Sequence, residues 1–147
     1  MPTPATYSTN GMKLGKGRYV EVDEYGKVAN FAWSKRYVTK TASYTVLRTE
    51  SGTCFVSTGA TADYVFTLPA ISTGPWHFEF IAGADYNLTV TAGTADTMVA
   101  YNDLAADSLA FSTNSEQIGG RILVDCDGTT LFATGVGHNL QHQTVST

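Results

Sequence analysis

Alternation of apolar and polar residues between residues 60 and 91, repeated between residues 119 and 137, restricts what this chain can fold into. The first stretch contains the runs DYVFTLP, PWHFEFIAG and NLTVT. Side chains on a β-strand point alternately to opposite faces, so each run presents one mostly apolar face to a core. Proline and glycine separate the runs, and this spacing is typical of a β-meander or a β-sandwich.

The second stretch, GGRILVDCDGTTLFATG, predicts the strongest hairpin of the chain. Its two β-rich halves flank Asp127-Gly128, and a glycine accepts the positive φ that a tight hairpin turn requires. Shorter strands are predicted at residues 19–22 and 28–33 as a small hairpin, at 44–48 and 53–56 across a turn, and at 97–100. Residues 105–111 fit either a strand or one helical turn.

These patterns predict an all-β fold, with a compact β-sandwich or jelly-roll-like body preceded by an extended N-terminal arm and hairpin. The 147 residues suffice for one domain with a sizeable core. Residues 1–43 are predicted to form the arm and small hairpin, residues 44–137 the body, and residues 138–147 a tail without a core-forming pattern.

Charge divides the chain unevenly. Residues 1–48 hold eight of the nine basic residues beside three acids, whereas residues 49–147 hold Arg121 and ten acids. A basic segment joined to an acidic body indicates either a partner for the basic part or attraction between the two parts. Because the whole chain is acidic and its cations are spread out, nucleic-acid binding is not expected. No apolar run approaches the roughly 20 residues that span a bilayer, so no membrane partner is expected.

No motif in the chain predicts catalysis, a cofactor or a metal. Cys54 and Cys126 are far apart among apolar neighbours, which favours two buried free thiols over a zinc site or a disulfide. His77 is expected to be the outward residue of a strand rather than the partner of a reactive cysteine. The spacing of His138 and His142 suits one helix face, but the tail shows no other helical signal.

The runs at residues 63–70, 74–84 and 86–90, with the hairpin at residues 122–135, resemble a recurrent β module of tailed-bacteriophage virion proteins. The resemblance covers roughly residues 60–137. Such modules occur in head decoration (cement) proteins, which are typically trimers at local three-fold positions of the capsid, and in tail-fibre and tail-tip proteins. The resemblance therefore implies a structural, non-enzymatic protein on the outer surface of a virion, made in the host cytoplasm.

A chain of this length suits a decoration protein better than a long, repetitive fibre. The expected partners are the major capsid protein and further copies of the chain, as a homotrimer. The hypothesis for attachment is that the basic arm lies on the capsid shell, with contacts from its cations, which are Lys13, Lys16, Arg18, Lys35, Arg36 and Lys40. Opposite charges speed docking and fix its register.

Two other classes of function remain open at this point. A tail-fibre or tail-tip module would recognise a host-surface glycan or receptor, with Trp76, Tyr86 or Tyr101 as exposed stacking platforms. An enzyme such as a depolymerase would need clustered carboxylates, but the acids of this sequence are scattered singly along turns. The enzyme hypothesis therefore ranks last.

Overall fold

The structure is a computed structural model, and it describes residues 21–22, 28–30, 35–93, 95–112, 117–137 and 143–147. Its contacts divide the chain into two units, residues 1–34 and residues 35–147. In the first unit, β1 (Glu21–Val22) pairs antiparallel with β2 (Val28–Asn30), which confirms the small hairpin. The second unit is all-β and is called the body below.

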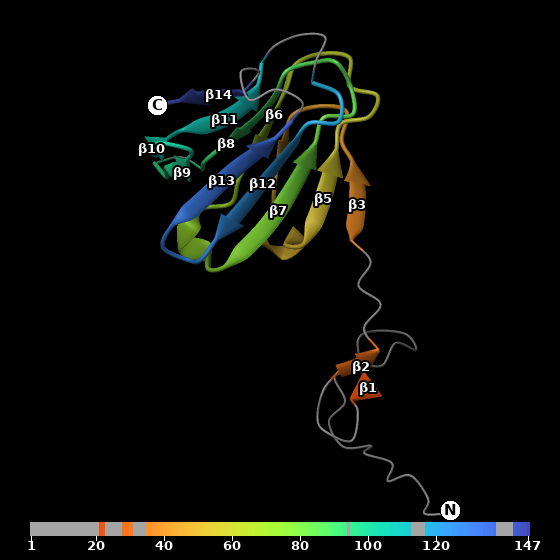
Figure 1. Ribbon diagram of the computed structural model, residues 1–147, viewed down its shortest axis with the longest axis vertical. Coiled ribbons are helices and arrows are strands. Elements are labelled where there is room, and N and C mark those ends of the chain that lie inside the picture. Colours follow the sequence, from red (N-terminus) through yellow and green to blue (C-terminus); the bar gives the residue numbers. More distant parts are fainter. Residues whose placement is uncertain (1–20, 23–27, 31–34, 94, 113–116, 138–142) are drawn as a thin grey trace, which may run out of the picture. The chain divides into compact units, whose positions relative to one another are not determined.

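The larger of two sheets in the body has seven strands in the order β10-β9-β13-β12-β7-β5-β3. Figure 1 shows β13, β12, β7, β5 and β3 side by side in this sheet. The strands, in that order, are β10 (Asp103–Ala106), β9 (Met98–Ala100), β13 (Leu131–Val136), β12 (Arg121–Cys126), β7 (Trp76–Ile81), β5 (Thr53–Val56) and β3 (Arg36–Thr39).

The second sheet has five strands in the order β14-β11-β8-β6-β4. They are β14 (Gln143–Ser146), β11 (Ser108–Phe111), β8 (Leu88–Thr91), β6 (Tyr64–Thr67) and β4 (Tyr44–Thr45). Two short 3-10 helices, η1 (Arg48–Glu50) and η2 (Ile71–Thr73), lie in the connections. The two packed sheets confirm the β-sandwich and exclude a simple meander.

Successive strands from β3 to β8 belong alternately to the two sheets. The chain therefore returns to each sheet one strand further along, in the same direction. This winding makes β3, β5 and β7 parallel neighbours in one sheet, and β4, β6 and β8 parallel neighbours in the other. The turn expected between residues 44–48 and 53–56 is accordingly a crossing between sheets, which η1 occupies.

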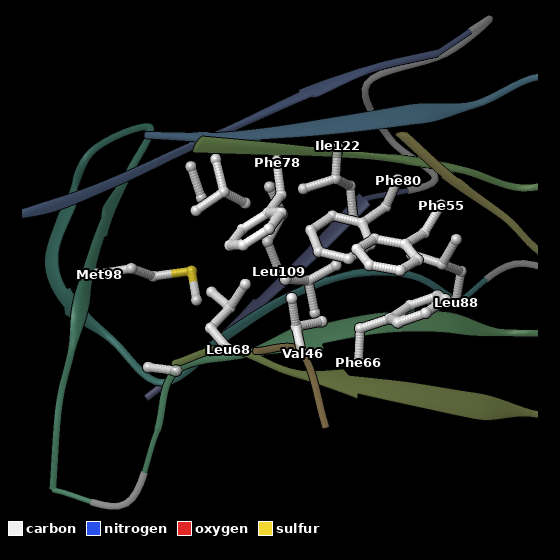
Figure 2. Packing of buried hydrophobic residues seen from close by; sticks show 14 of the residues in the cluster. Val46, Phe55, Phe66, Leu68, Phe78, Phe80, Leu88, Met98, Leu109 and Ile122 are labelled. Carbon is white, nitrogen blue, oxygen red and sulfur yellow. The ribbon is translucent and has the colours of Figure 1, made fainter. Parts of the chain in front are cut away.

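Aromatic side chains from both sheets fill the core. Phe55 and Phe80 of the larger sheet stack with ring centroids 5.7 Å apart, and Phe66 of the smaller sheet lies 4.8 Å from Phe80. Figure 2 shows these rings between the sheets, together with Phe78, Leu68 and other buried residues. Aromatic rings bury large areas, and tilted or offset pairs gain further stability. The alternation seen in the sequence is thus the inward face of each sheet.

The predicted hairpin at residues 119–137 is confirmed. β12 and β13 pair antiparallel over their full lengths, and Gly128 in the turn has a φ of +96°. The Asp127 carboxylate accepts hydrogen bonds from the Thr129 and Thr130 backbone N–H groups, each 2.7 Å long. These bonds, with one from the Thr129 hydroxyl, lower the pKa of Asp127 and close the turn.

Two boundaries differ from those expected from sequence. Residues 35–43 were placed with the arm, but β3 is an edge strand of the seven-stranded sheet. The tail was expected to lack a core-forming pattern, but β14 pairs along all of β11 and Val145 packs against the core. An edge strand needs only backbone partners and one inward side chain, so its sequence signal is weak. Pairing on both sides of β11 also decides the open choice at residues 105–111 in favour of a strand.

Candidate functional site

The side of the seven-stranded sheet that faces away from the core carries large apolar side chains. Every second residue of β12 and β13 is buried, and the residues between them point outward. Among these, Leu123, Phe132 and Val136 are 38%, 45% and 52% exposed. We call this side the outer face. On the six strands from β9 to β3 it comprises, by strand register, Tyr37, Thr39, Cys54, Val56, His77, Glu79, Ile81, Val99, Arg121, Leu123, Asp125, Phe132, Thr134 and Val136.

Pairing of β13, β12 and β7 arranges the outer face in three rows. The rows are Val136, Arg121 and Ile81; then Thr134, Leu123 and Glu79; then Phe132, Asp125 and His77. Apolar residues thus lie in every row, with charged residues between them. His77 is exposed, as the alternation of its strand predicts.

The outward side of the five-stranded sheet has a different chemistry. Its residues carry mainly hydroxyl groups, and they are Thr67, Thr89, Thr91, Ser108, Thr144 and Ser146, besides Val65 and Ala110. Hydroxyl groups keep their hydrogen bonds to water when they stay at a surface. Of the two sheet surfaces, only the outer face therefore gains much from being covered by an apolar partner.

A carboxylate lies near the centre of the outer face and is almost fully buried. Glu79 on β7 is 7% exposed. The Arg121 guanidinium, on the neighbouring β12, places Nη1 2.5 Å from Glu79 Oε1, and the Lys35 ammonium, just before β3, bonds Glu79 Oε2. We call these three residues the ion trio. Both cations are about half exposed, and each forms a salt bridge to the buried carboxylate.

Opposing effects act on the ionisation of Glu79. Burial alone would raise the pKa of its carboxyl group, but the hydrogen bonds from Lys35 and Arg121 and their positive charges outweigh burial, so the pKa is lowered. The same carboxylate raises the pKa of Lys35. The ion trio is therefore fully charged at neutral pH.

Cys54 pairs in register with Glu79 on the outer face. It is buried and forms no disulfide, and the same holds for Cys126 in β12, which confirms the expectation of two buried free thiols. Burial raises the pKa of both thiols. Because only the thiolate is strongly nucleophilic, both cysteines are expected to react slowly as nucleophiles at neutral pH.

The six cations predicted to contact a capsid fall into two groups. Lys13, Lys16 and Arg18 lie outside the described residues. Of the others, Lys35 bonds Glu79, and Arg36 is exposed on edge strand β3. Lys40 places its Nζ 3.2 Å from the centroid of the Tyr44 ring, a cation–π contact within the body. Lys35 and Lys40 thus have partners in their own chain.

One aromatic proposed as a stacking platform is not exposed, which corrects the sequence interpretation. Trp76 is buried because it shares the inward side of β7 with Phe78 and Phe80. Tyr86 and Tyr101 are partly exposed, and the Tyr101 hydroxyl donates to the Gly135 carbonyl oxygen at 2.9 Å. An open cavity of about 480 Å³ lies elsewhere, beside the five-stranded sheet, and its lining includes Asp96 and Asp107.

The described parts of the chain contain no group of three or more histidine, cysteine or acidic side chains that could hold a metal ion. Within the same residues, no helix is long and apolar enough to cross a membrane. No protein-family model matches this chain, and a search of curated proteins finds no similar sequence.

Sequence reasoning missed the ion trio. Glu79 interrupts an apolar strand run, which was a visible signal, because a carboxylate in such a run requires a cation. Its partners were not visible. Lys35 and Arg121 are 44 and 42 residues away in sequence, and only the pairing of β3, β5, β7 and β12 brings them together.

Proposed function

We propose that this protein is a structural component of a virion, a head decoration (cement) protein that binds the outer surface of a capsid and stabilises the shell. The proposal rests on the resemblance of residues 60–137 to virion β modules. Its supporting observation in the body is the outer face. Its partners are then the major capsid protein and further copies of the chain, and no cofactor or catalytic step is involved.

The outer face supports an assembly role because of its composition. Soluble proteins that act alone rarely expose large contiguous apolar patches, and such patches commonly mark protein contacts. Leu123, Phe132 and Val136 each expose apolar surface on adjoining rows of the outer face, beside the charged groups Arg121 and Asp125. Interfaces between proteins combine apolar centres with polar and charged groups in the same way.

Charge supplies the proposed means of attachment. Four basic residues precede residue 28 and Arg36 is exposed on β3, whereas the rest of the body is acidic. We propose that the basic residues before the body, together with Arg36, meet an acidic capsid surface. Of the six cations named for this role, Lys13, Lys16, Arg18 and Arg36 carry the proposal, since Lys35 and Lys40 already have partners in the body.

Co-sedimentation with capsids tests the proposal. Shells of the phage that encodes the chain, stripped of this protein, are mixed with the purified protein and pelleted. We expect saturable binding that weakens as salt rises, because exposed charges are screened. A variant with Lys13, Lys16 and Arg18 changed to Glu should bind less. The matched control makes the charge-conserving changes Lys13→Arg, Lys16→Arg and Arg18→Lys and should bind as wild type does. Absence of wild-type protein from the pellet at low salt would refute the proposal.

The homotrimer that the resemblance implies is part of the same proposal. A three-fold arrangement on a capsid requires a contact between copies, and sedimentation equilibrium measures the number of copies in solution. A trimer in solution or on the shell is the expected outcome of a three-fold contact.

A tail-fibre or tail-tip module that binds a host-surface glycan is the second candidate. The cavity lined by Asp96, Asp107 and several threonines favours it, because carboxylates and hydroxyl groups are common ligands of sugar hydroxyls. A glycan array with wild type and the Asp107→Ala variant tests this candidate. Binding that the variant loses would support it, and no binding to any glycan would exclude the glycan role.

A further inference from the structure

The outer face has a pattern that fits a second copy of itself. Arg121 and Asp125 lie two residues on either side of Leu123 along β12. On the neighbouring strand, Val136 and Phe132 lie two residues on either side of Thr134. Consider a two-fold axis that passes through Leu123 and Thr134, lies in the plane of contact and is perpendicular to the strands. This axis exchanges the row of Val136 and Arg121 with the row of Phe132 and Asp125.

We propose that two copies of this chain pack outer face to outer face about this axis. Arg121 of each copy then meets Asp125 of the other, and Val136 meets Phe132. Leu123, Thr134 and Glu79 share the middle row, so each meets its own counterpart at the axis. Such an interface is self-complementary, as a two-fold contact requires, because every residue and its partner occur on the same surface. The inference rests on the assembly role proposed above and names a second copy as one partner.

Sheet packing permits this arrangement. Two sheets pack face to face about 10 Å apart with their strands within about 30° of alignment. A 30° angle between the strands displaces a residue two positions from the axis by only a few ångströms relative to its partner. A long arginine side chain spans that distance. A guanidinium carries five N–H donors, so its bond to Glu79 leaves capacity for a second carboxylate.

Because of the ion trio, a partner can cover the outer face without burying a carboxylate that has no counter-charge. Removing water from an unpaired carboxylate is strongly unfavourable. Glu79 already has two cationic partners within its own copy, and its side chain is already shielded from water before any contact forms. The bare hydroxyl-lined side of the five-stranded sheet has no comparable apolar surface to remove from water.

The size of the face predicts weak association. At usual strand spacings, the five strands from β13 to β3 cover roughly 24 Å by 20 Å, or about 500 Å² per copy. Stable interfaces bury about 800 Å² per partner. The contact should therefore depend on protein concentration, and its detection needs protein on the order of 100 μM. A three-fold contact elsewhere on the chain is compatible with it, because trimers can pair through the weaker two-fold contact as the protein concentration rises.

A cysteine at the axis tests the geometry in the full-length protein. Leu123→Cys places one thiol of each copy at the axis, so a bismaleimide linker about 10 Å long, which matches the spacing of packed sheets, should join the two copies into a covalent dimer. Val65→Cys is the matched control, because Val65 is 37% exposed and Leu123 38%, and Val65 lies on the other sheet. We expect crosslinking of the first variant at least about tenfold faster. Equal crosslinking rates of the two variants would overturn the inference.

A charge exchange tests the register. Asp125→Arg sets two arginines against each other across each contact, so association should weaken by about tenfold or more. The conservative variant Asp125→Glu keeps the charge at this position and the bond between Arg121 and Glu79, so it should associate as wild type does. Equal association by wild type and Asp125→Arg would refute the register.

Two further outcomes distinguish the contact between copies from coverage of the face by residues 1–34 and from binding to the capsid. The Leu123→Cys variant could be monomeric, with a new thiol that reacts with maleimide far more slowly than that of the Val65→Cys control. This result would indicate that residues 1–34 cover the face. That result would overturn the contact with a second copy. Shell binding is measured separately. Crosslinking without shell binding would uphold the two-fold contact and refute the capsid role. Shell binding without crosslinking would uphold the capsid role and refute the two-fold contact.

Discussion

Replacement of Glu79 by Gln probes how much the ion trio contributes to folding. Glutamine keeps the length and one carbonyl oxygen of the side chain but removes its charge. The variant loses two charge-assisted hydrogen bonds of the wild-type protein. Arg121 Nη1 donates one of them to Glu79 over 2.5 Å, and the Lys35 ammonium donates the other. The change leaves both cations without a counter-charge at a site where the carboxylate is 7% exposed.

The expected cost lies between two limits. A hydrogen bond to a charged group contributes about 1.5–3 kcal/mol when it is buried, whereas an exposed ion pair contributes about 0.2–1 kcal/mol. Lys35 and Arg121 are 47% and 46% exposed, so solvent screens both bonds substantially. We therefore expect Glu79→Gln to lower the free energy of unfolding by about 1–3 kcal/mol at pH 7.

Acid should erase this difference. The pKa of Glu79 is lower in the folded protein than in the unfolded chain, so its stabilisation is fully present above the unfolded pKa of about 4.3 and is lost as pH falls through the folded value. The gap between wild type and variant should be constant from pH 6 to 7 and shrink below about pH 4. Asp127, whose pKa is also lowered, contributes equally to both proteins and cancels in the difference.

Urea unfolding followed by far-ultraviolet circular dichroism at several pH values measures the gap. Urea is preferable to guanidinium chloride, which would screen the ion trio. Dilute protein keeps any association from adding to stability. The matched control is Asp107→Asn, which removes an exposed carboxylate and should change little. A Glu79→Gln gap of the same size at pH 3 and pH 7, or no gap at pH 7, would refute the assignment.

Three other predictions concern the packing of the body. Phe80→Ala, at a fully buried ring of the aromatic core, should cost about 3–5 kcal/mol in urea unfolding, and a loss under about 1 kcal/mol would contradict that packing. Gly83→Ala should cost about 1–3 kcal/mol, because its new Cβ would lie 2.6 Å from Thr58 Oγ1 and 2.8 Å from the Thr58 backbone nitrogen; an unchanged melting temperature would argue against this close approach. The thiols of Cys54 and Cys126 should react slowly with a thiol reagent in the native protein and rapidly in urea, since both are buried, and fast native reaction would contradict their burial.

The strands were predictable from sequence because each carries its own signal. Alternation along residues 64–68 and 76–81 and the Asp127-Gly128 turn gave the fold class and the long hairpin. The same rule, applied consistently, would have placed Trp76 inside with Phe78 and Phe80. Its assignment as an exposed platform came from residue type alone, which is a weaker guide than position in a strand.

Which strand pairs with which was beyond the sequence pattern. Alternation with period two defines an inward and an outward side but says nothing about the neighbour. The winding between sheets sets β7 beside β5 and β12 rather than beside β6 or β8, which are its neighbours along the chain. The outer face and the ion trio depend on that arrangement, so both became visible only in the structure.

Charge balance links the ion trio to the proposed contact between copies. The outer face and its border hold two cations, Lys35 and Arg121, and two carboxylates, Glu79 and Asp125. Within one copy the trio alone has an excess positive charge, which Asp125 offsets from the far end of β12. In the two-fold arrangement each Arg121 lies between Glu79 of its own copy and Asp125 of the other, so the excess is neutralised where water is excluded. Because attraction strengthens as the local dielectric falls, the contact would reinforce the bonds that already hold Glu79 in the folded chain.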